Sequence, residues 1–326
     1  MQSVDFPADA IPRLIVVIDT EEQFNWDMPA DRSQRRVDAM RHIERVQDIF
    51  DQYAVTPCYV VDYPILEHPD GWELLKNFFD RGRCEIGAHL HPWVNPPYTE
   101  EMHVANTYPG NLSVELESSK LLELTNRITA VFGKRPVVYK AGRYGIGPNT
   151  PKLLKEQGYC VDLSHCPPVD YRQDGGPDFR SAGVSPGWLD QERSLLEIPV
   201  TGAYVGWLGG LRAPVYELAN QVKRLRLPGL LAKVSAVDRL MLSPEGFEAA
   251  EHRRLIAELM RRGVRTFTWS FHSPSVAPGY TPYVRDEKDL QRFLESFHRF
   301  FDLFFEQMRG LARTPVQIKS ELEALT

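Results

Sequence analysis

The sequence has few cysteines and no excess of positive charge. Its 326 residues include four cysteines, Cys58, Cys84, Cys160 and Cys166, and no two of them form a Cys-x-x-Cys pair. Scattered cysteines in a chain of this length indicate reduced thiols in a cytosolic protein. The formal net charge is −6. A nucleic-acid-binding protein needs a basic excess to neutralise phosphates, so nucleic acid is not an expected partner.

Long apolar runs and targeting signals are also missing. The first residues, MQSVDFPADAIPR, have neither the basic nor the apolar region of a signal peptide. No apolar run reaches the roughly 18 residues that a transmembrane helix needs, so we expect no transmembrane segment and a cytoplasmic location. Residues 224–242 mix Arg, Lys and Leu. They fit a helix on a membrane surface or an ordinary amphipathic helix broken near Pro228, and the second is favoured.

Short apolar runs rich in β-branched residues alternate with helical stretches along most of the chain. The expected strands are residues 14–18, 55–61, 84–91, 137–140, 159–163, 195–200 and 264–271. The expected helices are residues 36–53, 72–80, 113–132, 150–157, 247–262 and 286–308. Ser113 and Gly133 suit the two ends of the long third helix. This alternation indicates a mostly parallel sheet.

A barrel is favoured over an open doubly wound sheet. No glycine-rich fingerprint follows the first strand, as a dinucleotide-binding fold would require. Polar residues follow nearly all the strands, which is where barrel enzymes build their sites. We expect one domain over residues 1–326, with a long loop at about 165–194 and a helical insertion at about 205–245.

Acidic residues follow the first expected strand. Asp19 and Glu21 are two apart, so on extended backbone they share one face, where one can bind a metal while the other acts as a base. A solvated turn with helix-capping carboxylates explains them equally well. The third strand ends in His89 and His91, which project from one side beside Trp93. Two imidazoles in this arrangement favour zinc or a similar ion.

Two further strand ends carry candidate residues. Arg143 follows the fourth strand in KAGRYG, where it either orients a carboxylate or forms a structural salt bridge. His272 follows the last strand in WSFHSP and is a candidate acid or base. His165, just past the fifth strand, is within reach of the same site. Acids at three more strand ends fit salt bridges at the barrel rim or partners of the site residues: Asp62, Asp162 and Glu197.

In this order the motifs resemble those of the polysaccharide deacetylases with a NodB homology domain, carbohydrate esterase family four. The matching segments are VVIDTEE, EIGAHLHPW, AGRYG and WSFHSP, and the resemblance covers roughly residues 13 to 310. Three positions depart from the usual pattern. Thr20 stands where a second aspartate is common, Trp93 stands four residues after His89 where the second histidine is usual, and Gly145 replaces a proline.

The resemblance implies a distorted (β/α)7 barrel that hydrolyses an N-acyl group, acetyl or formyl, from an amino sugar. It assigns a divalent metal, Zn²⁺ first, to Glu21, His89 and His91, with Glu22 as the reserve ligand. Asp19 is then the base, His272 the acid that protonates the leaving amine, and Arg143 the residue that holds Asp19. The substrate contacts implied are Glu22, Trp93, Tyr144 and His165, with Tyr171 and Trp188 of the long loop as an aromatic wall.

The expected substrate is an N-acylated amino sugar of surface polysaccharide biosynthesis, as a nucleotide- or lipid-linked glycan precursor. Three alternatives remain open. A glycosidase using Asp19 and Glu197 leaves the histidine pair unexplained. An amidohydrolase barrel is expected to carry its histidine pair after the first strand. A catalytically degenerate barrel would bind a carbohydrate or scaffold an assembly.

Overall fold

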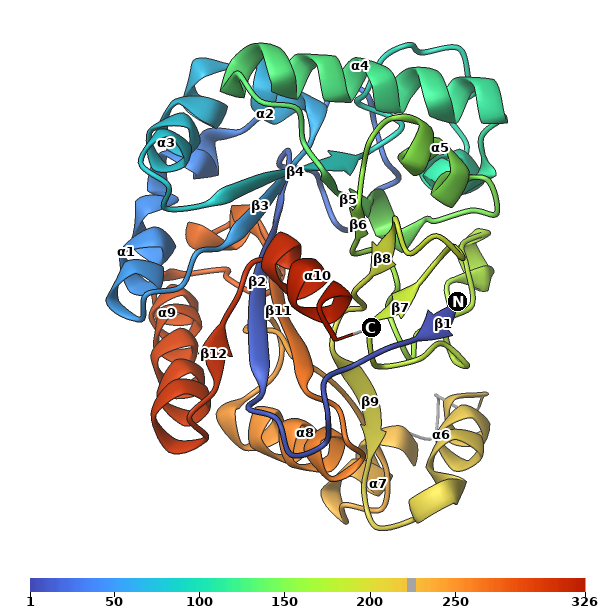
Figure 1. Ribbon diagram of the computed structural model, residues 1–326, viewed down its shortest axis with the longest axis vertical. Helices are drawn as coiled ribbons and strands as arrows, with labels where there is room; N and C mark the ends of the chain where they lie inside the picture. The colour runs from blue at the N-terminus through green and yellow to red at the C-terminus, as the bar shows by residue number, and fades with distance from the viewer. Residues whose placement is uncertain (222–226, 326) are drawn as a thin grey trace.

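Seven parallel strands form the centre of the fold, and their sheet curls into an incomplete barrel (Figure 1). The computed structural model describes residues 1–221 and 227–325. Across the sheet the parallel strands are β8 (Leu196–Glu197), β6 (Val161–Asp162), β5 (Val138–Ala141), β4 (Glu85–Leu90), β3 (Cys58–Val61), β2 (Arg13–Thr20) and β11 (Thr266–His272). Each overlaps one of the seven expected strands, so the predicted distorted (β/α)7 barrel is confirmed.

Shorter strands extend this sheet and help to close it. They are β1 (Gln2–Ser3), β7 (Gly187–Trp188) and β12 (Leu311–Ala312), together with a separate antiparallel pair, β9 (Gly202–Val205) and β10 (Asp238–Met241). Between β8 and β11 the barrel is bridged by segments outside the ladder. The backbone N–H of Thr268 donates to Thr201 Oγ1 at 2.8 Å, and that of Ser270 donates to the Leu242 carbonyl at 3.3 Å.

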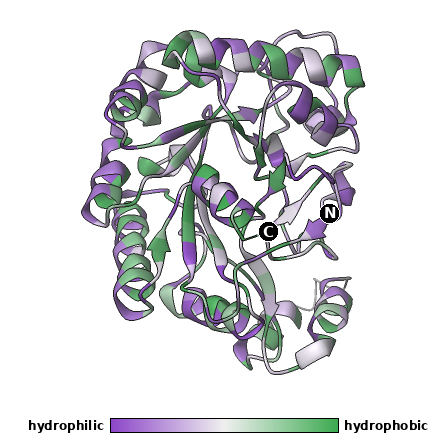
Figure 2. Ribbon diagram, viewed as in Figure 1, coloured by the Kyte–Doolittle hydropathy of each residue, from purple (hydrophilic) through white to green (hydrophobic). Residues whose placement is uncertain are grey.

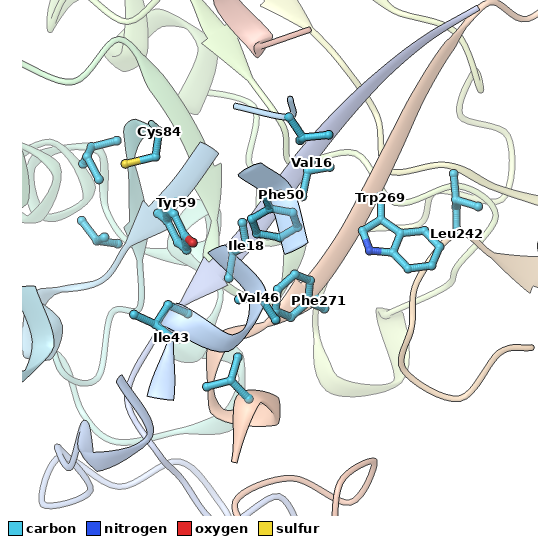
Figure 3. Packing of buried hydrophobic residues seen from close by; sticks show 14 of the residues in the cluster. Val16, Ile18, Ile43, Val46, Phe50, Tyr59, Cys84, Leu242, Trp269 and Phe271 are labelled. Carbon is cyan, nitrogen blue, oxygen red and sulfur yellow. The ribbon is translucent and has the colours of Figure 1, made fainter. Parts of the chain in front are cut away.

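Helices cover the outer face of the curled sheet. They are α1 (Glu44–Gln52), α2 (Tyr63–Glu67), α3 (Pro69–Asp80), α4 (Val114–Phe132), α5 (Thr150–Glu156), α8 (Ala249–Arg261) and α9 (Glu287–Phe301). Aromatic rings fill much of the space between the two layers, and Figure 3 shows Phe50 and Trp269 among them. Trp269 stacks on Phe300 of α9 with ring centroids 4.2 Å apart.

The barrel interior holds a second, smaller core. It is made by the strand residues that alternate with those facing the helices: Ile15, Val17, Cys58, Val60, Val138, Val161 and Leu196. Helix α10 (Pro315–Glu323), in the middle of Figure 1, packs Ile318 and Leu322 against them. Figure 2 shows hydrophobic residues concentrated on the same central strands. The inward-facing residues that follow Val17 and Val60 along their strands therefore lie at the end of the barrel opposite to α10.

Helix α4 follows the sequence prediction closely. The Ser113 hydroxyl accepts a hydrogen bond from the Leu116 N–H at 3.3 Å, and Gly133 ends the helix with a φ of 75°. A side-chain oxygen satisfies one of the unpaired N–H groups of the first turn, and glycine adopts the left-handed conformation without a Cβ clash. Both predicted caps are confirmed.

Three predicted helices differ in their limits. The helix expected over 36–53 is a 3-10 turn (Asp38–His42) followed by α1, and α3 begins three residues before the expected start at 72. The closing helix expected over 286–308 is regular to Phe301 and continues as a π-helical stretch (Asp302–Gln307). Periodicity locates a helix well, but its ends depend on tertiary packing.

The region expected to hold a helical insertion contains α6 (Arg212–Gln221), α7 (Leu227–Lys233) and, unexpectedly, strand β10. Residues 224–226, where the favoured amphipathic helix would begin, lie outside the described residues. Over the described ranges, no helix combines the length and the apolar character needed to cross a membrane. The single-domain organisation stays a prediction.

Candidate active site

Most of the predicted site residues line one cavity of about 710 Å³. It lies at the carboxyl ends of the parallel strands, because the inward face of each strand changes from apolar to polar there. In β2 the inward residues are Ile15, Val17 and then Asp19. The predicted residues that line the cavity are Asp19, Glu21, His89, His91, Trp93, Arg143, Tyr144 and His272.

Glu21, His89 and His91 bring three potential ligand atoms together. Glu21 Oε2 lies 3.5 Å from His89 Nε2 and 3.5 Å from His91 Nε2, and all three side chains are buried. The second carboxylate oxygen, Oε1, is buried without a hydrogen-bond partner. The burial of Glu21, reinforced by the nearby carboxylates of Asp19 and Glu22, raises its pKa well above the usual value. The site therefore favours a positive charge or a proton beside Glu21.

The two imidazoles present lone pairs rather than protons to this carboxylate. His89 Nδ1 lies 3.0 Å from the Lys140 carbonyl oxygen, which can only accept, so His89 Nδ1 carries the proton. His91 Nδ1 donates in the same way to Glu22 Oε2 at 2.9 Å. Burial lowers the pKa of His89 well below its usual value and that of His91 to about 4. At neutral pH both Nε2 atoms are therefore unprotonated acceptors.

This donor set fits a divalent metal ion. Three acceptors that face one another repel unless a cation or a proton lies between them. Ligand atoms about 2.1 Å from a tetrahedral zinc ion lie about 3.4 Å from each other, close to the 3.5 Å separations found here. Two histidines and one glutamate are the donor set of catalytic zinc sites that keep one position open.

Glu22 supports this site from behind instead of contacting a substrate. It is fully buried and is absent from the residues that line the cavity. Its two carboxylate oxygens accept hydrogen bonds from His91 Nδ1 and, at 2.8 Å, from Trp93 Nε1. Its own backbone N–H donates to Asp62 Oδ2 at 2.9 Å. The predicted substrate contact of Glu22 is not supported by this geometry, because Glu22 lies outside the cavity lining and both of its oxygens orient neighbours. Glu22 also forms a second group of potential ligands with Asp62 and His91, so its role as reserve ligand stays a prediction.

Asp19 is held by Lys140 in a buried ion pair. Lys140 Nζ donates to both Asp19 oxygens, at 2.6 and 2.7 Å, and both side chains are buried. Burial alone would raise the pKa of Asp19, but the charge of Lys140 and its hydrogen bonds, with a contribution from His272, outweigh it and hold the pKa below its usual value. Asp19 is therefore an ionised carboxylate at neutral pH.

Replacing Lys140 with methionine is expected to lower the free energy of unfolding by about 3–5 kcal/mol, because it leaves the Asp19 carboxylate buried without a counter-charge. Urea denaturation measures the loss. The double variant Asp19→Asn/Lys140→Met should recover much of it, whereas Lys76→Met, which breaks an exposed pair with Asp80, should cost less than about 1 kcal/mol. Equal losses in Lys140→Met and Lys76→Met would show that the buried pair does not stabilise the fold.

Arg143 does not hold Asp19, which corrects the sequence prediction. Its guanidinium donates to Thr107 Oγ1 at 2.6 Å and to Asp174 Oδ2 at 2.9 Å, and it lies over the ring of Tyr108. The physical reason is the backbone: Arg143 has a φ of 53° and Tyr144 one of 58°. The chain turns sharply after β5, so the inward residue of this strand is Lys140, and Arg143 lies on the cavity wall.

His272 is paired with Glu245, a residue that the sequence did not single out. His272 Nδ1 lies 2.7 Å from Glu245 Oε2, and the His272 backbone N–H donates to Glu245 Oε1 at 3.2 Å. Burial opposes protonation of His272, but the Glu245 carboxylate outweighs it and raises the pKa of His272 above its usual value. His272 Nε2 lies 3.9 Å from Asp19 Oδ2. An imidazole whose protonated form is favoured by Glu245 therefore faces an ionised carboxylate across the base of the cavity.

Glu245→Gln is expected to lower the pKa of His272, because it removes the charge that favours the imidazolium and leaves burial to oppose it. In the wild type the protonated form persists to higher pH, and in the variant it is lost at lower pH. The imidazole carbon-bound proton signals, followed by NMR as pH is varied, measure the shift. The pKa of His42, which is lowered by burial and by the nearby charges of Arg45 and Arg41, should be the same in both proteins. An unchanged His272 titration would contradict the assigned pair.

Three residues considered in the sequence lie outside the cavity lining. His165 packs against the ring of Phe179 at 5.3 Å between centroids, so its predicted substrate contact is not supported by the geometry. Glu197 is fully buried beside Asp162, its partner across β6 and β8. It cannot share a substrate with Asp19, which removes the support for the glycosidase alternative. Trp188 is buried in the barrel interior and so cannot form an aromatic wall.

Aromatic rings form much of the cavity wall. Trp93 stacks on His91 at 4.2 Å between centroids, and Tyr144 stacks on Tyr171 at 5.7 Å with an angle of 26° between the rings. Trp26 meets His272 edge-on at 5.0 Å. The cavity wall offers flat apolar surfaces and the floor of the cavity carries charged groups. This combination suits a ligand that has a ring and a polar group at which the reaction takes place.

This chain is similar in fold to several proteins of known structure. No family profile and no curated protein matches the sequence. A Mycobacterium smegmatis structure described as a polysaccharide deacetylase is 17% identical, with a TM-score of 0.59 over 100% of this chain and 94% of that one. PuuE allantoinase is 14% identical, with a TM-score of 0.54 over 96% of this chain and 90% of that one. A Pseudomonas aeruginosa PAO1 polysaccharide deacetylase is 16% identical, with a TM-score of 0.50 over 96% and 91%.

At sequence identities this low, the similarity establishes a shared fold and no more. This chain has the curled α/β architecture of the polysaccharide deacetylase structures, as the sequence resemblance implied.

Proposed function

We propose that this protein is a metal-dependent hydrolase that removes an N-acyl group, acetyl or formyl, from an amino sugar. The observation that carries the proposal is the convergence of His89 and His91 on Glu21, beside the ionised carboxylate of Asp19 and the imidazole of His272. The shared fold of the polysaccharide deacetylase structures supports the same reaction class.

Asp19 is the group suited to accept a proton from the attacking water. Held by Glu21, His89 and His91, a zinc ion would supply Lewis acidity at the acyl carbonyl. Lys140 keeps Asp19 ionised and fixes both of its oxygens, so the carboxylate needs no reorganisation before it accepts the proton at Oδ2. Lys140 thus takes the positioning role that the resemblance implied for Arg143.

His272 is the group suited to protonate the departing amine. Its Nδ1–H is directed at Glu245, so the proton available for transfer is the one on Nε2, which faces the cavity. Glu245 favours the imidazolium form and so helps His272 to retain that proton. The environment shifts the pKa values of base and acid, 3.9 Å apart, in opposite directions, as suits a pair of proton-transfer groups.

The proposed substrate is an N-acylated amino sugar that serves as a nucleotide- or lipid-linked precursor of a surface polysaccharide, processed in the cytoplasm. The Tyr144–Tyr171 stack supports a sugar ring as the group that fills the cavity, because an aromatic face packs well against the apolar side of a pyranose. The cytoplasmic location stays a prediction from the sequence.

Release of acetate or formate tests the proposal. Purified protein with added zinc is assayed on N-acetylated and N-formylated sugar nucleotides and lipid-linked sugars. Allantoin is included because one structure of the same fold is an allantoinase. We expect release from at least one sugar, lost with a chelator and restored by zinc. Binding of a sugar without any release would instead favour the carbohydrate-binding alternative, and release from allantoin alone would replace the sugar as substrate.

A further inference from the structure

Arg239 is a cationic side chain in the cavity wall that no carboxylate neutralises. It lies on β10 and lines the cavity together with Met241, two residues further along the same strand. The neighbouring Asp238 points to the other face, where it pairs with Arg254 at 3.6 Å. Within residues 1–221 and 227–325, no carboxylate oxygen lies within 4.0 Å of the Arg239 guanidinium. The guanidinium carbon lies 5.7 Å from the centroid of the Tyr216 ring.

An aromatic platform connects this arginine with the reaction centre. Lys140, which holds Asp19, lies 4.9 Å from the ring centroid of Tyr144, and Tyr144 stacks on Tyr171. The Tyr171 hydroxyl in turn contacts Cys166 Sγ at 3.5 Å. Burial raises the pKa of both Tyr171 and Cys166, and the Arg239 charge opposes the rise in each, as expected of a guanidinium close to both groups.

The charges of the cavity give a bound molecule one orientation. At its base, the cationic side chains are already matched by carboxylates, Lys140 by Asp19 and His272 by Glu245. Among the described residues, two arginines line the wall; Arg143 is paired with Asp174, whereas Arg239 has no carboxylate partner. An anionic group is therefore attracted to the Arg239 end of the platform, and the neutral amide is left at the base.

We propose that the substrate carries an anionic group, a phosphate or a carboxylate, that binds Arg239 while its acyl amide lies beside Asp19. This inference rests on the proposed function and narrows its substrate to anionic N-acyl amino sugars. A guanidinium offers two parallel N–H donors that match the oxygens of a phosphate or a carboxylate. Its charge attracts such an anion most strongly where no carboxylate of the protein is already paired with it.

Calorimetric binding tests the inference without requiring turnover. The Asp19→Asn variant, which should hydrolyse the ligands much more slowly than the wild type, is titrated with N-acetylglucosamine, its 1-phosphate and N-acetylmuramic acid, which carries a carboxylate. We expect at least one anionic ligand to bind about tenfold more tightly than the neutral sugar, with the preference reduced by added salt. The tighter of the two anions identifies the group. Adding Arg239→Gln should abolish the preference and leave the affinity for N-acetylglucosamine unchanged.

Arg262→Gln is the matched control, because Arg262 is an exposed arginine at the end of α8, outside the cavity lining. It should keep the preference. Equal binding of neutral and anionic ligands, no binding of either anion, or a preference that survives Arg239→Gln would overturn the inference. Acyl release without any preference for anions would leave the proposed function standing. Arg239-dependent anion binding without acyl release from any substrate would instead remove the proposed function.

Discussion

Alanine in place of His89 or His91 is expected to abolish tight binding of a divalent ion. Each substitution removes one of the two imidazole nitrogens that lie 3.5 Å from Glu21 Oε2. Loss of an outer hydrogen-bond partner already lowers metal affinity 10–100-fold, so loss of a ligand should lower it by more than about 100-fold. Elemental analysis of the purified proteins and competition with a chelator measure the change. Acyl release should fall to background in both variants.

Two further variants make this experiment specific. Glu22→Gln keeps the metal ligands but cannot accept both the His91 and the Trp93 hydrogen bonds, so we expect a 10–100-fold loss of affinity. His103→Ala removes an exposed histidine at the cavity wall whose Nδ1 accepts from a backbone N–H, and it should bind zinc normally. If both His89→Ala and His91→Ala contain as much zinc as the wild type, the proposed metal site is wrong.

Alternation within short apolar strands was enough to predict where most of the site lies. Ile15 and Val17 face the barrel interior, so Asp19 must face it too, and the same parity holds for His89 and His91 at the end of β4. Parallel strands bring their carboxyl ends to one side of the sheet, which places residues far apart in sequence together. Short apolar runs therefore predicted the seven central strands, and the two-residue spacing of Asp19 and Glu21 and of His89 and His91 predicted that each pair shares a face.

The partners of these residues depend on geometry that no local pattern contains. Lys140 was part of an expected strand, but its ion pair with Asp19 requires the register of β5 against β4 and the positions of β2 and β3. Arg143 was misassigned because its positive φ, which redirects the chain after β5, has no signature in an arginine. The resemblance implied that a cationic residue after β5, Arg143, holds Asp19. In the structure this cation is Lys140, three residues earlier in the sequence.

Glu245 was missed for a related reason. It follows β10, a strand expected to be part of a helical insertion, so nothing marked it as a residue at a strand end. His165 shows the opposite error, since it follows β6 as predicted but packs on Phe179 away from the cavity. Position after a strand gives the correct end of the barrel, whereas the direction of a side chain in a loop depends on that loop's tertiary contacts.

Asp19→Asn is expected to lower the rate of acyl release by about 10²–10⁴-fold and to leave the metal content unchanged. The substitution removes the proton acceptor with almost no change of shape. Asp19 is separate from the three ligand atoms contributed by Glu21, His89 and His91, so the ion should still bind. Zinc content and kcat are measured on the same preparations. The two readouts together separate a base from a ligand.

Asp170→Asn is the control, since Asp170 pairs with Arg172 and lies outside the cavity lining. It should keep both kcat and zinc. Loss of zinc in Asp19→Asn would make Asp19 a ligand and leave the base unassigned. A wild-type kcat would show that Asp19 is not the base. Only a slow enzyme that retains zinc is consistent with an ionised Asp19 that accepts the proton of the attacking water.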